Sequence, residues 1–168
     1  MPYFLLTLLI LAFDQIIKVM VTIKLVPLQS VTIIKGIFTI TYVRNYGAAF
    51  GILQSQTLIL IALSIAVIFF VWINRNKLSG YPKVFQVGLG LALGGALGNL
   101  VDRIRLGYVV DFLDFQVWPV FNLADIAIVG GVGLIILSFY YDHKAKTGKS
   151  IGDAPSEVSH GTVGKEEM

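Results

Sequence analysis

Residues 88–103 read GLGLALGGALGNLVDR, and the stretch places a small residue at every fourth position of a predicted membrane helix. Gly90, Gly94 and Gly98 fall on one helix face, and this spacing lets membrane helices approach closely. A further step of four residues reaches Asp102. We therefore expect a close-packed glycine face that ends in a carboxylate at one edge of the membrane.

Asn99 and Arg103 accompany Asp102 at the end of this helix. Two interpretations fit these polar residues equally well. They form part of a functional site, or they cap the helix and extend to the membrane interface, where polar groups meet water. Spacing alone does not separate the two.

The composition indicates a membrane protein. Of the 168 residues, 56% are hydrophobic and 14% charged, and the mean hydropathy is +0.80. The net charge of +3 does not indicate nucleic-acid binding, because the basic residues form no stripe. There is no cysteine, and His143 and His160 both follow the last apolar run. A thiolate nucleophile, a disulfide framework and a histidine base in the body of the chain are thereby excluded.

Four apolar segments approach the length of about 20 residues that a membrane span needs. They predict an integral membrane protein, mainly α-helical, with four transmembrane helices at about 3–24, 56–74, 84–102 and 121–141. The first run has no basic residues ahead of it and no small-residue cleavage site after it, so we expect a retained helix rather than a removable signal peptide.

Residues 27–55 lie between the first two helices and are rich in Val, Ile, Thr, Tyr and Phe. The alternation in GIFTITYVRN predicts a small sheet or hairpin at the membrane surface, because unpaired strand edges cannot lie in hydrocarbon. Asn45 precedes the small residues of NYGAAFG. Such a segment admits a closely approaching ligand backbone, or it is a plain turn.

The basic residues suggest an orientation, since Lys and Arg in short loops favour the cytoplasm. Two groups of lysine and arginine fall on one side of four helices, against five such residues on the other: Arg75, Lys77, Lys83, Lys144, Lys146 and Lys149 oppose Lys24, Lys35, Arg44, Arg103 and Arg105. We expect both termini to be cytoplasmic. Residues 1–146 then form a single domain, and the polar segment 147–168 is predicted to be a disordered cytoplasmic tail.

Asp14 and Lys18 lie four residues apart in the first helix. At this spacing the two side chains share a face and can pair, which lowers the cost of both charges within the membrane. A structural ion pair is the favoured interpretation, with direct catalysis as the alternative.

Three aspartates follow in VVDFLDFQVWPVFNLADIAI, residues 109–128. Asp125 lies one turn into the last apolar run with Asn122 on the same face, and an unpaired charge at that depth is costly and usually functional. Pairing it with a second aspartate would raise one of the two pKa values, leaving one acid and one base to activate water. Asp114 is expected to be solvated or to cap a turn.

Other functions also fit the clustered carboxylates. A Mg²⁺ or Ca²⁺ site is one, although no phosphate-binding loop accompanies the acids. A small transporter or channel subunit is another, but the second helix carries only Thr57 and Ser64 within its run, too few for a polar path. A structural assembly subunit is a third, and it would tolerate loss of both aspartates.

Five ordered blocks carry a specific resemblance over residues 3–141: DQIIK, NYGAAF, GGALGNLVDR, VVDF and FNLAD. They closely resemble the motifs of lipoprotein signal peptidase, or signal peptidase II. The resemblance implies a monomeric aspartic protease of the bacterial inner membrane with four spans and a small periplasmic sheet. It implies cleavage of prolipoprotein signal peptides just before a diacylglyceryl-modified cysteine, near the outer face, with no cofactor, metal or nucleic acid.

The resemblance also implies roles for individual residues. The catalytic pair falls on Asp111 and Asp125, and the supporting polar residues fall on Asp14, Asn45, Asn99, Asp102, Arg103 and Asn122, with Lys18 paired to Asp14. We expect Arg103 and Asn45 to hold substrate backbone. Asp114 matches no motif, and Ile17 stands where the family often has Ser or Thr.

Overall fold

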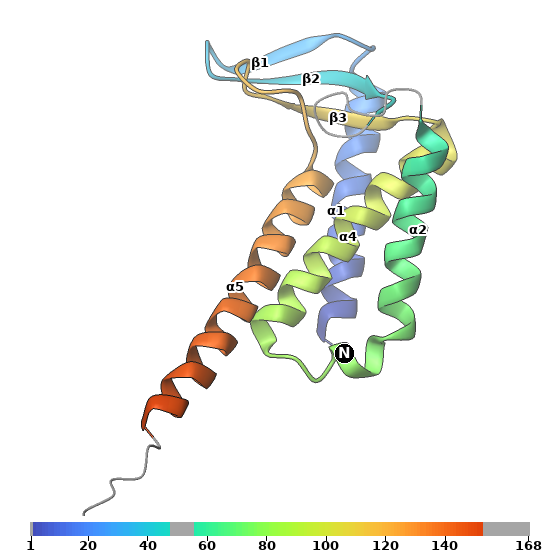
Figure 1. The fold of residues 1–168 in the computed structure, drawn as a ribbon. Coiled ribbons are helices and arrows are strands. Elements are labelled where there is room, and N and C mark those ends of the chain that lie inside the picture. Colours follow the sequence, from blue (N-terminus) through green and yellow to red (C-terminus); the bar gives the residue numbers. More distant parts are fainter. Residues whose placement is uncertain (1, 48–55, 153–168) are drawn as a thin grey trace, which may run out of the picture.

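The computed structural model describes residues 2–47 and 56–152, with side chains for 3–47 and 56–144. Within these residues the helices and strands occur in the order α1 (Pro2–Lys24), β1 (Ser30–Ile34), β2 (Phe38–Asn45), α2 (Thr57–Ile73), α3 (Arg75–Leu78), α4 (Lys83–Leu106), β3 (Val109–Asp114) and α5 (Leu123–Gly152). The fold is a helical bundle with a small sheet across one end (Figure 1).

Three helices of the described chain are long and apolar enough to cross a membrane, at Tyr3–Lys24, Lys83–Leu106 and Leu123–Lys144. These agree with three of the four predicted spans. The fourth, α2, is apolar throughout but has 17 residues, which at the helical rise gives about 25 Å. That is less than the roughly 30 Å of a typical hydrocarbon core, so the fourth crossing stays a prediction.

The glycine face of α4 packs against α1, as the spacing predicts. A Cβ added at Gly94 would lie 2.7 Å from the Cβ of Ile10, and one added at Gly98 would lie 2.5 Å from Oδ2 of Asp14. Both distances are too short for real contacts, so only glycine allows this approach. The same face thus sets the distance between the two helices and brings α4 onto the carboxylate of Asp14.

A second glycine face, which the sequence analysis did not separate from the first, packs α4 against α5. A Cβ at Gly88 would lie 2.6 Å from the carbonyl oxygen of Gly131, and one at Gly95 would meet the carbonyl oxygen of Ala124. Because α4 carries small residues on two faces, it lies between α1 and α5 and contacts both (Figure 1).

The sheet has three antiparallel strands in the order β1-β2-β3. The hairpin of β1 and β2 was predicted, whereas the third strand β3, which lies between α4 and α5, was not. The strand was missed because it is stabilised by its partner β2, 64 residues away at the pair Asn45↔Val109, rather than by a local pattern. Asp111 is therefore held in a ladder, opposite Val43.

The sheet is fixed to the end of α1 by an apolar cluster of buried residues: Val21, Leu25, Tyr42, Val110 and Phe112. The N-terminus and the distal end of α5 lie at the other end of the bundle (Figure 1). The predicted tail differs in part, because α5 continues through Gly152. No proline lies between Pro119 and Pro155 to end the helix earlier, and residues 153–168 lie outside the described part.

The α4–α5 contact gives a first prediction. Gly95→Ala places a methyl group against the backbone of Ala124, and we expect the free energy of unfolding to fall by about 1–3 kcal/mol, the usual cost of overpacking. Gly133→Ala is the matched control, because a Cβ there meets nothing within 4 Å. Equal thermal stability of the two variants in detergent would contradict this account of the helix interface.

Candidate active site

Asp111 and Asp125 line one cleft of about 1160 Å³ beneath the sheet. Asp111 comes from the middle of β3 and is 1% exposed, whereas Asp125 lies in the first turn of α5 and is partly exposed. Asn45, Asn99 and Arg103 line the same cleft. The structure thus brings together residues from β2, α4, β3 and α5 that the sequence analysis selected.

Two asparagine amides connect the aspartates. Asn122 donates through Nδ2 to Oδ1 of Asp111 at 2.7 Å and to Oδ1 of Asn99 at 3.1 Å. Asn99 in turn donates through Nδ2 to Oδ1 of Asp125 at 2.8 Å. The path Asp111–Asn122–Asn99–Asp125 is therefore continuous, and its two amides are buried.

Asn122 also forms the N-terminal cap of α5. Its Oδ1 accepts from the backbone N–H of Asp125 at 2.9 Å, and Oδ2 of Asp125 accepts from the backbone N–H of Asn122 at 3.2 Å. This reciprocal pair is a capping box with Asn and Asp in place of Ser and Glu. The cap that begins the helix thus also orients the Asp125 carboxylate.

Asn45 supports Asp111 from β2. Its Nδ2 donates to Oδ2 of Asp111 at 2.8 Å, and its Oδ1 accepts from the backbone N–H of Gly47 at 2.9 Å. In the structure both ends of this amide are hydrogen-bonded within the chain, because the pairing of β2 with β3 places Asn45 next to Asp111. Its expected contact with substrate backbone stays a prediction.

The pKa of Asp111 is raised to about 7. Burial of the carboxyl group is the main cause, and the nearby charge of Asp125 adds to it. The hydrogen bonds from Asn45 and Asn122 act in the opposite direction, because they stabilise the charged form. A carboxyl with this pKa exchanges its proton near neutral pH, as a general acid or base must.

Lys18 lies behind the cleft and is 2% exposed. Its Nζ is 2.9 Å from Oδ2 of Asp14 and 2.9 Å from Oδ2 of Asp102, and it donates to Oδ1 of Asn99 at 3.0 Å. The i,i+4 pair predicted in the first helix is confirmed, and the structure adds a second carboxylate and an amide. All three hydrogens of the ammonium group are thereby engaged.

Each carboxylate that pairs with Lys18 also holds a backbone N–H beside one of the two cleft aspartates. Oδ1 of Asp14 accepts from Ala124 N at 3.0 Å, immediately before Asp125. Oδ2 of Asp102 accepts from Val110 N at 3.0 Å, immediately before Asp111. The ion cluster thus fixes the backbone at both aspartates, which no spacing rule predicts.

Gln15 belongs to the same cluster, although the sequence analysis assigned it no role. Its Nε2 donates to Oδ1 of Asp102 at 2.9 Å and to the carbonyl oxygen of Gly98 at 3.2 Å. The sequence feature that could have indicated this role is the position of Gln15 beside Asp14, on the helix that packs against the glycine face of α4. It couples α1 to α4 at the level of Gly98.

Arg103 borders the cleft, and its contacts are with the chain itself. Nη2 donates to the carbonyl oxygen of Gly47 at 3.1 Å, and Nη1 donates to that of Asn99 at 3.5 Å. The guanidinium group therefore fastens the end of the β2 segment to α4. The small residues that follow Gly47 in NYGAAFG lie outside the described residues.

Asp114 takes no part in the cleft. Oδ2 accepts from the Thr41 hydroxyl at 2.7 Å and Oδ1 from the backbone N–H of Gln116 at 2.8 Å. The bond from Thr41 is the main reason that the pKa of Asp114 lies below its usual value. It closes the turn after β3, where Gln116 has a positive φ of 62°, in agreement with the capping role expected from the sequence.

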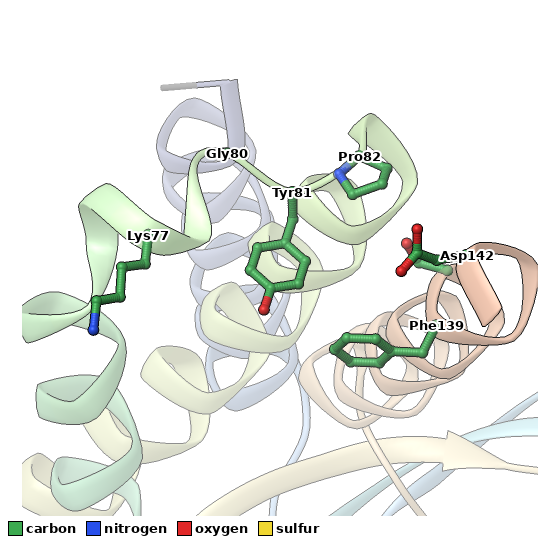
Figure 2. Close-up of a pocket in the computed structure, with 7 residues that line it drawn as sticks. Lys77, Gly80, Tyr81, Pro82, Phe139 and Asp142 are labelled. Carbon is green, nitrogen blue, oxygen red and sulfur yellow. The ribbon is translucent and has the colours of Figure 1, made fainter. Parts of the chain in front are cut away.

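A second cavity of about 310 Å³ lies at the opposite end of the bundle. Figure 2 shows Tyr81, Pro82, Phe139 and Asp142 around it, with Lys77 on the other side of the Tyr81 ring. It contains one carboxylate, so it offers no acid and base pair. The larger cleft is the candidate active site.

The sequence is similar to those of known proteins. Residues 6–141 match the family described as Signal peptidase (SPase) II. A lipoprotein signal peptidase of Halothermothrix orenii is 46% identical over 141 residues, covering 84% of this chain and 97% of the relative. One of Moorella thermoacetica is 48% identical over 132 residues, covering 79% and 88%.

The fold is also similar to solved structures. A protein described as a bacterial membrane enzyme, determined at 2.3 Å resolution, superimposes with a TM-score of 0.79 at 30% identity and covers 94% of each chain. A second, at 1.9 Å resolution, gives a TM-score of 0.74 at 32% identity and covers 82% of this chain and 92% of the other.

The raised pKa of Asp111 can be tested without an activity assay. We expect infrared titration to show a protonated carboxyl band that is lost with a midpoint near pH 7 and is absent from Asp111→Asn. Asn45→Leu removes a hydrogen bond to the charged form, so the midpoint should rise. Asp114→Asn is the control and should leave the band unchanged; a midpoint near pH 4 in the unaltered protein would contradict the assignment.

Proposed function

Because the chain belongs to the signal peptidase (SPase) II family, we propose that Asp111 and Asp125 carry out the peptide hydrolysis for which the family is named. The chain is a bacterial membrane protein that cleaves signal peptides from prolipoproteins. The observation that supports the catalytic assignment is the continuous amide path between two carboxyl groups that share one cleft.

In the proposed reaction the two aspartates share one proton and bind a water molecule between them and the substrate. The ionised carboxylate takes a proton from this water as its oxygen attacks the scissile carbonyl carbon. The protonated carboxyl donates its proton to the carbonyl oxygen, giving a tetrahedral diol. When the C–N bond breaks, the amine leaves with a proton from the dyad, so no covalent intermediate is needed.

The raised pKa of Asp111 fits the proposed pairing of one general acid with one general base. With a pKa of about 7, Asp111 can hold the shared proton at neutral pH. Asp125 is the more exposed of the two and lies at the start of α5, where a negative charge is favourable. We therefore assign the initial acid role to Asp111 and the base role to Asp125.

The shape of the cleft suits a substrate that remains in the bilayer. Its walls include Ile126, Ile128, Val129 and Gly130 on α5 and Ser64 on α2, so it extends from the sheet along the helices. We propose that the lipid of a diacylglyceryl-modified cysteine occupies this apolar arm, with the scissile bond just before the cysteine placed at the aspartates. Arg103 and the segment that it fastens at Gly47 would then border the peptide.

The topology follows from the arrangement of the ends. The N-terminus and the distal end of α5 lie opposite the sheet (Figure 1), and the lysine and arginine residues of the loops favour that end by six to five. We propose that this end is cytoplasmic and that α2 provides the fourth crossing. The active site then lies near the outer face of the membrane, and the protein acts as a monomer. The residues after 147 would then extend into the cytoplasm.

Each cleft aspartate should be essential. Asp111→Asn and Asp125→Asn should each give a folded membrane protein without detectable cleavage, because either change removes the acid and base pair. The assay uses purified protein and a diacylglyceryl-modified prolipoprotein, with cleavage followed by mass spectrometry. Asp114→Asn is the matched control and should retain activity, since its contacts close a turn outside the cleft. Substantial turnover by either cleft variant would refute the assignment.

Chelation separates this mechanism from a metal-dependent one. Each of the four carboxylate oxygens of the pair already accepts one N–H donor, which favours an acid and base pair over a cation site. We expect full activity after dialysis against EDTA. Activity that is lost on dialysis and returns with Mg²⁺ or Ca²⁺ would support the metal alternative instead.

A further inference from the structure

The hydrogen bonds around the two aspartates have a common direction. Asp111 accepts from Nδ2 of Asn45 and from Nδ2 of Asn122, and Asp125 accepts from Nδ2 of Asn99 and from the backbone N–H of Asn122. Among the hydrogen bonds of the described residues, the surrounding groups donate to these carboxyl oxygens and accept nothing from them. Such a shell stabilises negative charge on the pair and opposes the effect of burial.

The direction of each amide is fixed by a group that can only donate. The backbone N–H of Gly47 fixes Oδ1 of Asn45, and the backbone N–H of Asp125 fixes Oδ1 of Asn122. For Asn99, the donor to Oδ1 is the ammonium group of Lys18, together with Nδ2 of Asn122. Reversing any of these amides would set donor against donor and acceptor against acceptor, so their orientations follow from the network.

Lys18 differs from the other two anchors because it carries a charge. An amide oxygen that accepts from an ammonium group is polarised, and its N–H becomes a stronger donor. The strengthened donor is Nδ2 of Asn99, which is bonded to Oδ1 of Asp125 at 2.8 Å. The ammonium group is thus linked to Asp125 through one amide.

We propose that Lys18 is a positioning residue of the reaction: through Asn99 it completes a shell around the aspartates that only donates hydrogen bonds. This role rests on the proposed function and adds to the ion pairing of Lys18. Because the shell offers no acceptor, the proton shared by the pair can pass only to the other aspartate, to water or to the substrate. The proton taken from water is therefore retained for the carbonyl oxygen and the leaving amine.

Among the described residues, the charged groups at the network and its cleft come from five elements. Asp14 and Lys18 come from α1, Arg44 from β2, Asp102 and Arg103 from α4, Asp111 from β3 and Asp125 from α5. A test must remove the link from Lys18 to Asn99 without leaving two buried carboxylates unpaired. Lys18→Met combined with Asp14→Asn does so, because the net charge of the Asp14, Lys18 and Asp102 cluster is preserved.

The measurement is the pH profile of kcat/KM for cleavage of the lipid-modified substrate. We expect kcat to fall on the order of 100-fold, as when a preorganised donor is lost, with little change in KM. The acidic limb of the profile should move to higher pH, because a weaker donor makes the charged form of the pair less favourable. Lys77→Met, an exposed lysine at the far end, should match the unaltered protein.

Asn99→Leu is the second variant, chosen because it preserves size, adds no charge and cannot donate to Asp125. It should move the acidic limb in the same direction, and it replaces the double variant if that protein does not fold. An acidic limb that stays in place, with activity lowered uniformly or only through KM, would overturn the proposal. Failure of the proposed function would look different, because the unaltered protein would then not cleave the substrate at all.

Discussion

The structure depends on one buried lysine that must be neutralised. Lys18 pairs with two carboxylates from different helices, Asp14 and Asp102, in a region that excludes water. Two charges taken out of water are costly unless their hydrogen bonds are satisfied, and here each carboxylate also accepts a backbone N–H beside a cleft aspartate, at Val110 or Ala124. Charge neutralisation therefore sets the positions of β3 and α5 relative to α1.

The glycine faces of α4 make this cluster possible. A methyl group at Gly98 would displace the Asp14 carboxylate, and one at Gly95 would displace the backbone of Ala124. Gly95 and Gly98 both make these contacts at the level of the ion cluster. Close packing in this protein is therefore a requirement of the site as well as of the bundle, since a wider separation would move the carboxylates away from their N–H donors.

The cleft combines features that peptide hydrolysis in a membrane requires. One side offers a sheet and a carboxyl group with a pKa of about 7, and the other offers an apolar wall along α5. The amides between the two aspartates hold them without supplying an alternative proton acceptor. The same geometry would not suit a conducting path, because the polar groups gather at one end of the bundle.

The sequence by itself determined three membrane-capable helices, the glycine face of α4 and the Asp14–Lys18 pair, because these follow from local spacing and from the cost of charge in lipid. It also selected Asp111 and Asp125 as candidate catalytic residues, through the resemblance to a known family. Only the tertiary structure decided that Asp111 lies on a third strand and that Asn45 serves Asp111. It also decided that Lys18 is joined to Asn99. These contacts connect residues 66 to 81 positions apart, so they depend on strand pairing and helix packing, which no local pattern specifies.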